Sequence, residues 1–146
     1  MLKLEVNIVN KERATDLPRR YLNGLDSGIR NAMSYAVENA RSRFGTRGNV
    51  KSRTGKYKDS IRSVVRKTSV GYVGSLTSDC IYAPVHEFGA TIYPKSGEYM
   101  RFPINGNWVT LSKVVIPKRP LLGPALQESL SQIEDIIVGN IVKETN

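Results

Sequence analysis

The alternation of apolar and polar residues at the start of the chain predicts a β-strand. Leu, Val or Ile occupies every second position from Leu2 to Ile8, and Lys, Glu or Asn lies between them. A period of two places these apolar side chains on one face of an extended segment. We therefore expect residues 2–8 to form a half-buried strand.

A long amphipathic helix is predicted next. Apolar residues recur every three or four positions over Leu25–Phe44, so they line one face of a helix. Thr15 or Asp16 can cap the start of this helix. Gly24 and Gly28 lie inside it and weaken its first half, so that a kink or a break is expected to be tolerated there.

Short strands dominate the middle of the chain. Runs of β-branched and aromatic residues predict strands at residues 61–65, 70–76, 91–93, 99–102, 108–111 and 114–116. Asn105-Gly106 separates two of these runs and predicts a tight hairpin, because both residues accept positive φ. Residues 82–89 instead predict one helical turn that ends at Gly89.

A second long helix closes the predicted fold. Pro120 and Pro124 bracket its start, and apolar residues continue at helical spacing over Leu122–Ile141. The order of elements predicts an α+β fold with a long N-terminal helix, a mostly antiparallel sheet of short strands, and a C-terminal helix packed on the sheet. We expect residues 1–146 to form a single domain.

Composition places the chain among globular proteins. Its 146 residues are 40% hydrophobic and 24% charged, and no apolar run approaches the roughly 18 residues that a membrane-spanning helix needs. The first residues, MLKLE, lack the pattern of a signal peptide, so export is not expected. A single cysteine, Cys80, excludes an internal disulfide and fits a reducing compartment.

Positive charge is concentrated in one part of the chain. The net charge is +9, and between Arg41 and Lys67 ten basic residues face only one acidic residue, Asp59. Such asymmetry suggests a polyanionic neighbour, either nucleic acid or an acidic protein surface, although a solvated basic face explains it equally well. Within this region residues 45–58 are rich in Gly and basic residues, which predicts a mobile basic loop.

No pattern of catalytic or ligand-binding residues emerges. His86 is the only histidine, and the second histidine of a zinc-protease helix would fall at position 90, which is Ala90. Cys80 and His86 lack a third group that would orient them as a nucleophile and base. The glycines match neither a P-loop nor a dinucleotide-binding motif. We therefore expect no catalytic residue, no bound metal and no cofactor, and we interpret the chain as a non-enzyme.

Three stretches of sequence resemble a known family. Residues 53–61 read RTGKYKDSI, residues 82–89 read YAPVHEFG, and residues 116–126 read IPKRPLLGPAL. In this order, and together with the long helix that precedes them, they are similar to the tail-completion and head–tail joining proteins of long-tailed bacteriophages, a group that includes minor tail protein Z of lambda-like phages. The resemblance covers roughly residues 20–140, and Leu121 stands where Phe is common in the family.

The resemblance implies a structural role in the virion. It implies a subunit of a homo-oligomeric ring, a hexamer, at the head–tail junction, which is present in the host cytoplasm during assembly. The implied partners are the tail terminator or tail tube protein on one side and the head-completion or connector protein on the other. The charge and glycine content of residues 45–58 add a hypothesis about this loop: either it becomes ordered when the ring docks, or it lines the lumen of the ring and contacts DNA non-specifically. No contact with a membrane is expected.

Eight residues are candidates for interaction: Arg47, Lys51, Arg53, Lys56, Lys58, His86, Glu87 and Arg119. In the YAPVHEFG stretch, Tyr82 and Phe88 are expected to fill a core edge and to leave His86 and Glu87 at an exposed corner, paired either locally or with another subunit. Arg119 is expected near the positive N-terminal end of the last helix, where we favour a structural salt bridge over a subunit contact.

The alternative function is that of a basic DNA-binding accessory protein. Residues 41–67 would then neutralise duplex phosphates in a salt-dependent and sequence-independent way. Only Phe44 and Tyr57 are aromatic among these basic residues, so base stacking is not expected to contribute much.

Overall fold

The computed structural model describes residues 1–9, 18–45, 50, 51 and 53–146, with the backbone alone for residues 8 and 9. The elements are β1 (Leu2–Val9), α1 (Arg19–Ser42), α2 (Lys56–Ser60), β2 (Ile61–Thr68), β3 (Gly71–Ser78), α3 (Ala83–Phe88), β4 (Ala90–Ile92), β5 (Met100–Ile104), β6 (Asn107–Leu111), β7 (Val114–Ile116) and α4 (Leu122–Thr145). The predicted α+β class is confirmed, and so is the predicted order of helices and strands, except that helix α2 was not predicted.

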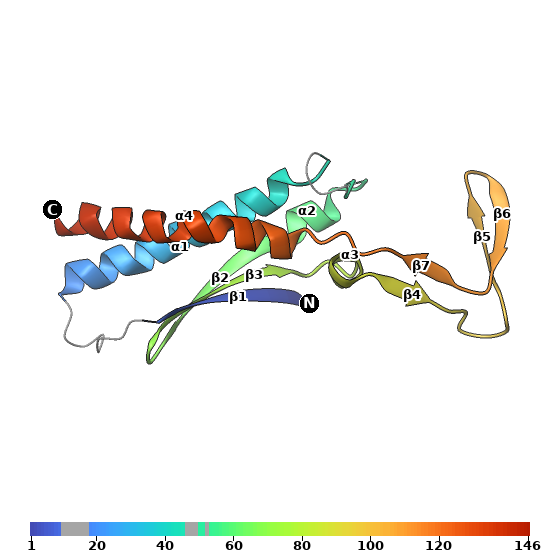
Figure 1. Ribbon diagram of the computed structural model, residues 1–146, viewed down its shortest axis with the longest axis horizontal. Helices are drawn as coiled ribbons and strands as arrows, with labels where there is room; N and C mark the ends of the chain where they lie inside the picture. The colour runs from blue at the N-terminus through green and yellow to red at the C-terminus, as the bar shows by residue number, and fades with distance from the viewer. Residues whose placement is uncertain (10–17, 46–49, 52) are drawn as a thin grey trace.

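A three-stranded antiparallel sheet forms one layer of the body. Its strand order is β1-β3-β2, and Leu4 pairs with Leu76 on one side of the central strand while Val65 pairs with Gly74 on the other. Helices α1 and α4 lie on one face of this sheet (Figure 1). Ile29 and Met33 of α1 are fully buried together with Leu76, so the core lies between the helices and the sheet.

Helices α1 and α4 pack along each other in opposite directions, and the two glycines of α1 make this contact close. A Cβ atom added at Gly24 would lie 2.7 Å from Ile141 Cα, and one added at Gly28 would lie 2.9 Å from Ile137 Cα. Helix α1 runs unbroken through both positions. The glycines made a break possible, but none is present in the described helix, because tertiary packing outweighs their low helix propensity.

The two long helices depart from the sequence prediction at the start of α1 and at one position inside α4. Pro18 precedes α1, and the predicted caps Thr15 and Asp16 lie outside the described residues. Helix α4 buries most of the apolar residues that were expected to line one of its faces, but Leu130 is 40% exposed.

The side chain of Asn39 on α1 also links the two long helices. It donates hydrogen bonds to the carbonyl of Ala125 and to Oγ of Ser129 on α4, each at 3.0 Å.

An extended arm (residues 90–119) projects beyond α3, away from the two long helices (Figure 1). Strand β4 pairs with β7 near the body, and β5 pairs with β6 further out. The predicted hairpin turn is confirmed, since φ is 50° at Asn105 and 83° at Gly106. Every residue of the arm is at least partly exposed, so the arm has no core of its own.

Candidate functional site at the base of the arm

The carboxylate of Glu87 holds the base of the arm to the last helix. Its Oε1 accepts hydrogen bonds from the backbone N–H groups of Leu121, at 2.6 Å, and Leu122, and its Oε2 accepts a longer one of 3.4 Å from Gly123. Helix α4 has no side-chain cap of its own. Glu87 thus supplies both the missing acceptors and a negative charge at the positive end of the helix dipole.

The positions of Glu87 and its aromatic neighbours reverse the sequence prediction. Glu87 is only 8% exposed, whereas Tyr82 is 60% and Phe88 is 70% exposed. The expected exposed corner at Glu87 and the expected packing of the two aromatic rings are both wrong. The reason is the four-residue spacing of Ala83 and Glu87, which places both on the inner face of α3.

Three rings pack together beside Glu87. Tyr57 of α2 lies edge-on to Phe44, with ring centroids 5.2 Å apart, and stacks on His86 of α3 at 5.7 Å. Burial, and after it the negative charge of Glu87, raises the pKa of Tyr57. The Tyr57 ring is only 6% exposed, so it joins α2 to the core.

The predicted basic loop has anchors that its composition did not reveal. Val50 and Tyr57 both belong to the buried core, and α2 begins at Lys56. Residues 46–49 and 52 lie outside the described residues, and mobility of the loop stays a prediction. Two apolar side chains among many polar ones give no periodic pattern, which is why the sequence did not identify them.

Backbone contacts at Gly89 and Arg119 close the base of the arm. Gly89 has φ of 74°, and a Cβ there would lie 3.0 Å from both the carbonyl O of Ile116 and the N of Lys118. The N–H of Arg119 donates to the carbonyl of His86 at 2.7 Å. The Arg119 side chain is exposed, and within the described parts of the chain the favoured structural salt bridge is absent.

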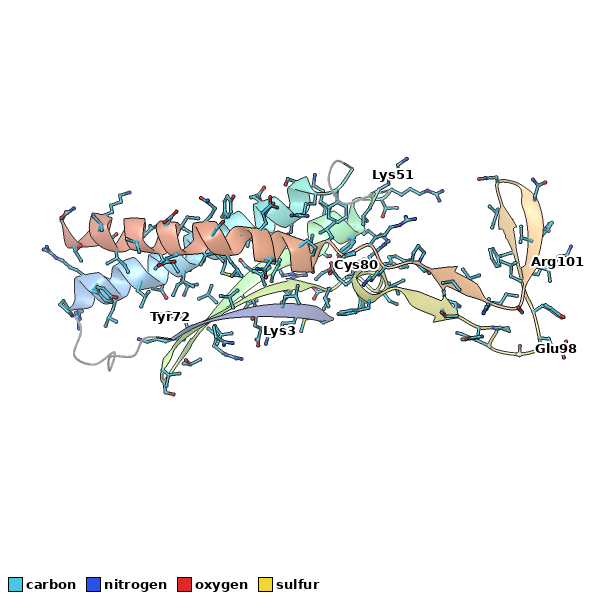
Figure 2. All side chains as sticks on the ribbon, in the orientation of Figure 1. Lys3, Lys51, Tyr72, Cys80, Glu98 and Arg101 are labelled. Carbon is cyan, nitrogen blue, oxygen red and sulfur yellow. The ribbon has the colours of Figure 1, made fainter. Side chains whose placement is uncertain are left out.

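A pocket of about 330 Å³ opens beside the stacked rings. Three of the predicted basic residues, Lys51, Arg53 and Lys56, line it together with His86, so the fold brings together half of the predicted interaction residues. Its other lining residues are Phe44, Val50, Thr54, Tyr57 and Tyr82. Figure 2 shows Lys51 beside α2 with its side chain directed outward.

The chemistry of this pocket suits an anionic group. Nδ1 of His86 is buried without a hydrogen-bond partner in the described part of the structure, whereas the Tyr57 hydroxyl lies close to the Glu87 carboxylate. Three cationic side chains line the pocket together with aromatic rings. Such a set can bind a carboxylate or a phosphate by charge and by hydrogen bonding. Among the residues described, no three His, Cys, Asp or Glu side chains gather closely enough to hold a metal ion.

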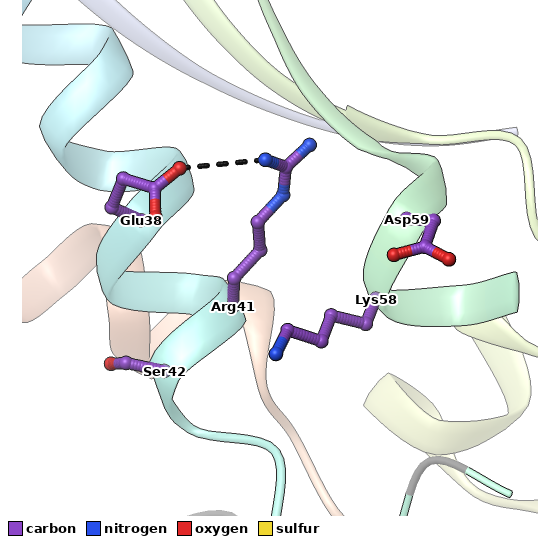
Figure 3. Close-up of a pocket in the computed structure, with 5 residues that line it drawn as sticks. All are labelled: Glu38, Arg41, Ser42, Lys58 and Asp59. Atoms are coloured by element: carbon purple, nitrogen blue, oxygen red, sulfur yellow. Dashed lines mark hydrogen bonds and ion pairs between the residues drawn. The ribbon is translucent and has the colours of Figure 1, made fainter. Parts of the chain in front are cut away.

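Lys58 lies in a separate hollow between α1 and α2 (Figure 3). The other lining residues are Glu38, Arg41, Ser42 and Asp59, so charges of both signs are present. A dashed line in Figure 3 marks the ion pair of Arg41 with Glu38, whose atoms are 3.4 Å apart. Lys58 is therefore separated from the basic pocket, and the remaining predicted residue, Arg47, lies outside the described residues.

Several basic residues of the 41–67 region serve the fold. Arg41 also donates to the carbonyl of Ile61 at 2.9 Å. Arg43 is paired with Glu128 on α4, and Arg62 on β2 with Asp79. The basic surface available to a partner is correspondingly smaller than the sequence suggested.

Neither the sequence nor the structure of the chain matches a known protein in the comparisons made: no family model, no curated protein and no solved structure is similar to it. Of the helices in the described ranges, none is long and apolar enough to span a membrane.

Proposed function

We propose that this chain is a structural subunit of the head–tail junction of a tailed bacteriophage. In this proposal it is not an enzyme. It forms a homo-oligomeric ring, a hexamer, that joins the tail to the head connector during assembly. The ring contacts the tail terminator or tail tube protein on one side and the head-completion or connector protein on the other.

One observation carries the proposal: the three stretches that resemble tail-completion proteins meet in a single joint. The RTGKYKDSI stretch contributes Tyr57, which stacks on His86 of the YAPVHEFG stretch. The latter stretch contributes Glu87, which caps the N–H groups of Leu121 and Leu122 in the IPKRPLLGPAL stretch. Three stretches that resembled the family only by chance would not be expected to contact one another in the fold. The contacts between them therefore support the view that they form one structural unit.

The shape of the molecule supports a role in assembly. A body of two long helices on a sheet carries an arm in which every residue is at least partly exposed (Figure 1). Both outer strands of the sheet, β1 and β2, are paired on one side only within the described chain. Subunits of a closed ring can cover such edges and arms with their neighbours.

The DNA-binding alternative is favoured by one observation, the basic pocket rim formed by Lys51, Arg53 and Lys56. Against it stands the use of Arg41 and Arg43 in contacts within the chain. A duplex-binding surface needs several phosphate contacts on one continuous face. The basic residues at the pocket rim that make no contact of this kind within the described chain are close together. They are better suited to bind a single anionic group than to contact several phosphates along a DNA duplex.

Cryo-electron microscopy of intact phage particles tests the proposal. The expected result is density for this chain as a ring between the tail tube and the head connector. Absence of the chain from purified particles would overturn the structural role. Duplex binding by the purified chain, with an affinity that falls steeply between 50 and 200 mM salt as expected for about six or more phosphate contacts, would then support the alternative.

A further inference from the structure

The arm exposes an apolar surface that its own fold leaves uncovered. Trp108, the only tryptophan of the chain, is 64% exposed near the tip. Other large apolar side chains that are exposed on the arm are Ile92, Tyr93, Tyr99, Ile104, Leu111 and Val115. A two-stranded ribbon without a packed face is at best marginally stable in water. A partner that covers this surface therefore stabilises the arm.

The charge of the arm indicates the nature of that partner. Five basic residues and one acidic residue, Glu98, lie in residues 90–119, which gives a net charge of +4. Arg101 lies over the Trp108 ring, 5.2 Å from its centroid, so one cation lies against the exposed tryptophan (Figure 2 labels Arg101 and Glu98). Lys95 and Lys113 are exposed and have no ion-pair partner among the residues that the structure describes. The surface complementary to the arm is apolar and acidic.

Such a surface lies on the outer side of α4. Leu130, Glu134, Val138 and Val142 follow one another at spacings of four residues, and Asp135 lies beside them. All five are exposed, and α4 as a whole carries four acidic residues against one basic residue. We call these five residues the α4 row.

A hollow adjoins one end of the α4 row. It has a volume of about 300 Å³ and lies between β1 and α4. Leu4, Val6, Leu126 and Leu130 give it a largely apolar lining. An aromatic side chain from a partner fits beside such a surface, and the open edge of β1 runs along it.

The arm and the helix that carries the α4 row extend in opposite directions from the base of the arm (Figure 1). The arm leaves the body beyond α3, whereas α4 runs from the base of the arm in the opposite direction (Figure 1). One chain therefore does not cover its own α4 row with its own arm. Two copies related by a head-to-tail operation bring the two surfaces together, and repetition of that contact closes a ring when the rotation per subunit allows it.

We infer that the arm of one copy of this chain binds the α4 row of the next copy. Trp108 and its apolar neighbours contact Leu130, Val138 and Val142, while the arm cations face Glu134 and Asp135. This inference deepens the proposed function and rests on it for the closure into a ring. The two fail separately, because self-association is measured on the purified chain and the location in the virion is measured on particles.

Charge reversal tests the inference on the full-length chain by sedimentation velocity at about 50 mM salt. The arm variant is Lys95→Glu/Lys113→Glu, and the helix variant is Glu134→Lys/Asp135→Lys. We expect the wild type to associate as its concentration rises, with a blue shift of the Trp108 emission. Each variant alone should associate at least tenfold more weakly. An equimolar mixture of the two should regain association, because every arm then meets a complementary row on the other variant.

A matched control uses Arg66→Glu/Lys67→Glu, which changes the charge by the same amount on β2, outside the two surfaces. This variant should associate within about twofold of wild type. The inference is overturned by a wild type that stays monomeric with unchanged Trp108 emission up to about 200 μM. It is also overturned by an arm variant that associates normally, or by a mixture that stays as weak as its components. Loss of duplex DNA binding in the arm variant without loss of self-association would assign the arm to nucleic acid instead.

Discussion

Replacement of Glu87 by Ala removes the cap of α4 and leaves its first N–H groups without acceptors. Leu121 and Leu122 are both fully buried, so water cannot take the place of the carboxylate oxygens. The side chain of Glu87 also links α3 to α4 across 34 positions of sequence. The substitution therefore weakens the joint at the base of the arm as well as the end of the helix.

The size of the effect follows from the three hydrogen bonds. Leaving a buried backbone donor unsatisfied costs about 1–3 kcal/mol, and two donors here are fully buried while the third, of Gly123, is bound at 3.4 Å. Loss of the short side chain of a helix cap alone costs about 1 kcal/mol. We expect Glu87→Ala to lower the free energy of unfolding by about 3 kcal/mol. Glu87→Gln keeps one acceptor oxygen and should cost about 1 kcal/mol, since only the charge and the weaker bond are lost.

Urea unfolding followed by circular dichroism at a low protein concentration measures these differences. A loss of about 3 kcal/mol should appear in a thermal scan as a decrease in Tm of about 10 °C, at roughly 3 °C per kcal/mol for a chain of this size. Glu98→Gln serves as the control, because Glu98 is exposed on the arm. Its effect should remain within about 0.5 kcal/mol.

A Glu87→Ala protein that unfolds within about 0.5 kcal/mol of wild type would refute the reasoning. That result would mean that the N–H groups at the start of α4 find other acceptors. Equal losses for the Ala and Gln variants would show that the charge, and not the number of acceptors, determines the stability of the joint.

Two further predictions test the packing of the body. Gly28→Ala should lower the free energy of unfolding by about 1–3 kcal/mol despite the better helix propensity of Ala, because the new Cβ meets the backbone of Ile137 at 2.9 Å. Gly139→Ala, in open space on α4, should raise it by about 0.5–1 kcal/mol. Changes of the same sign for the two variants in urea unfolding would contradict this. The second concerns pH. Because the fold raises the pKa of Tyr57 above its ordinary value of about 10, the folded state keeps the proton longer than the unfolded chain, so stability should fall as pH rises above 10. In urea titrations at pH 9–11, Tyr57→Phe should make the decrease in stability with pH shallower. Burial also raises the pKa of Tyr72, so Tyr72 should account for part of the pH dependence that the variant retains.

Local patterns were sufficient to predict the fold class and every element except α2. The alternation at residues 2–8, the helical spacing over residues 25–44 and the Asn105-Gly106 turn all correspond to observed structure. Each of these signals depends on periodicity or on backbone preference within a few residues. Such preferences act on short segments, so the sequence of the segment contains them.

The arrangement of the candidate site depended on contacts between distant segments. The basic residues Lys51, Arg53 and Lys56 were identified from charge, but only the fold shows that they meet His86 in one pocket. For Glu87, the sequence contained a single indirect signal: no Ser, Thr, Asp or Asn precedes α4 in the IPKRPLL segment to cap it.

The sequence by itself determined the α+β class, the positive charge and the order of the elements other than α2. Only the tertiary structure decided that Glu87 is buried, that Gly24 and Gly28 form a close helix contact, and that the arm has no core. The physical reason is that burial depends on which surfaces meet across the whole chain. Whether a glycine or a carboxylate stabilises or destabilises the fold therefore depends on the residues around it. Those residues are brought there by packing between segments that are far apart in sequence.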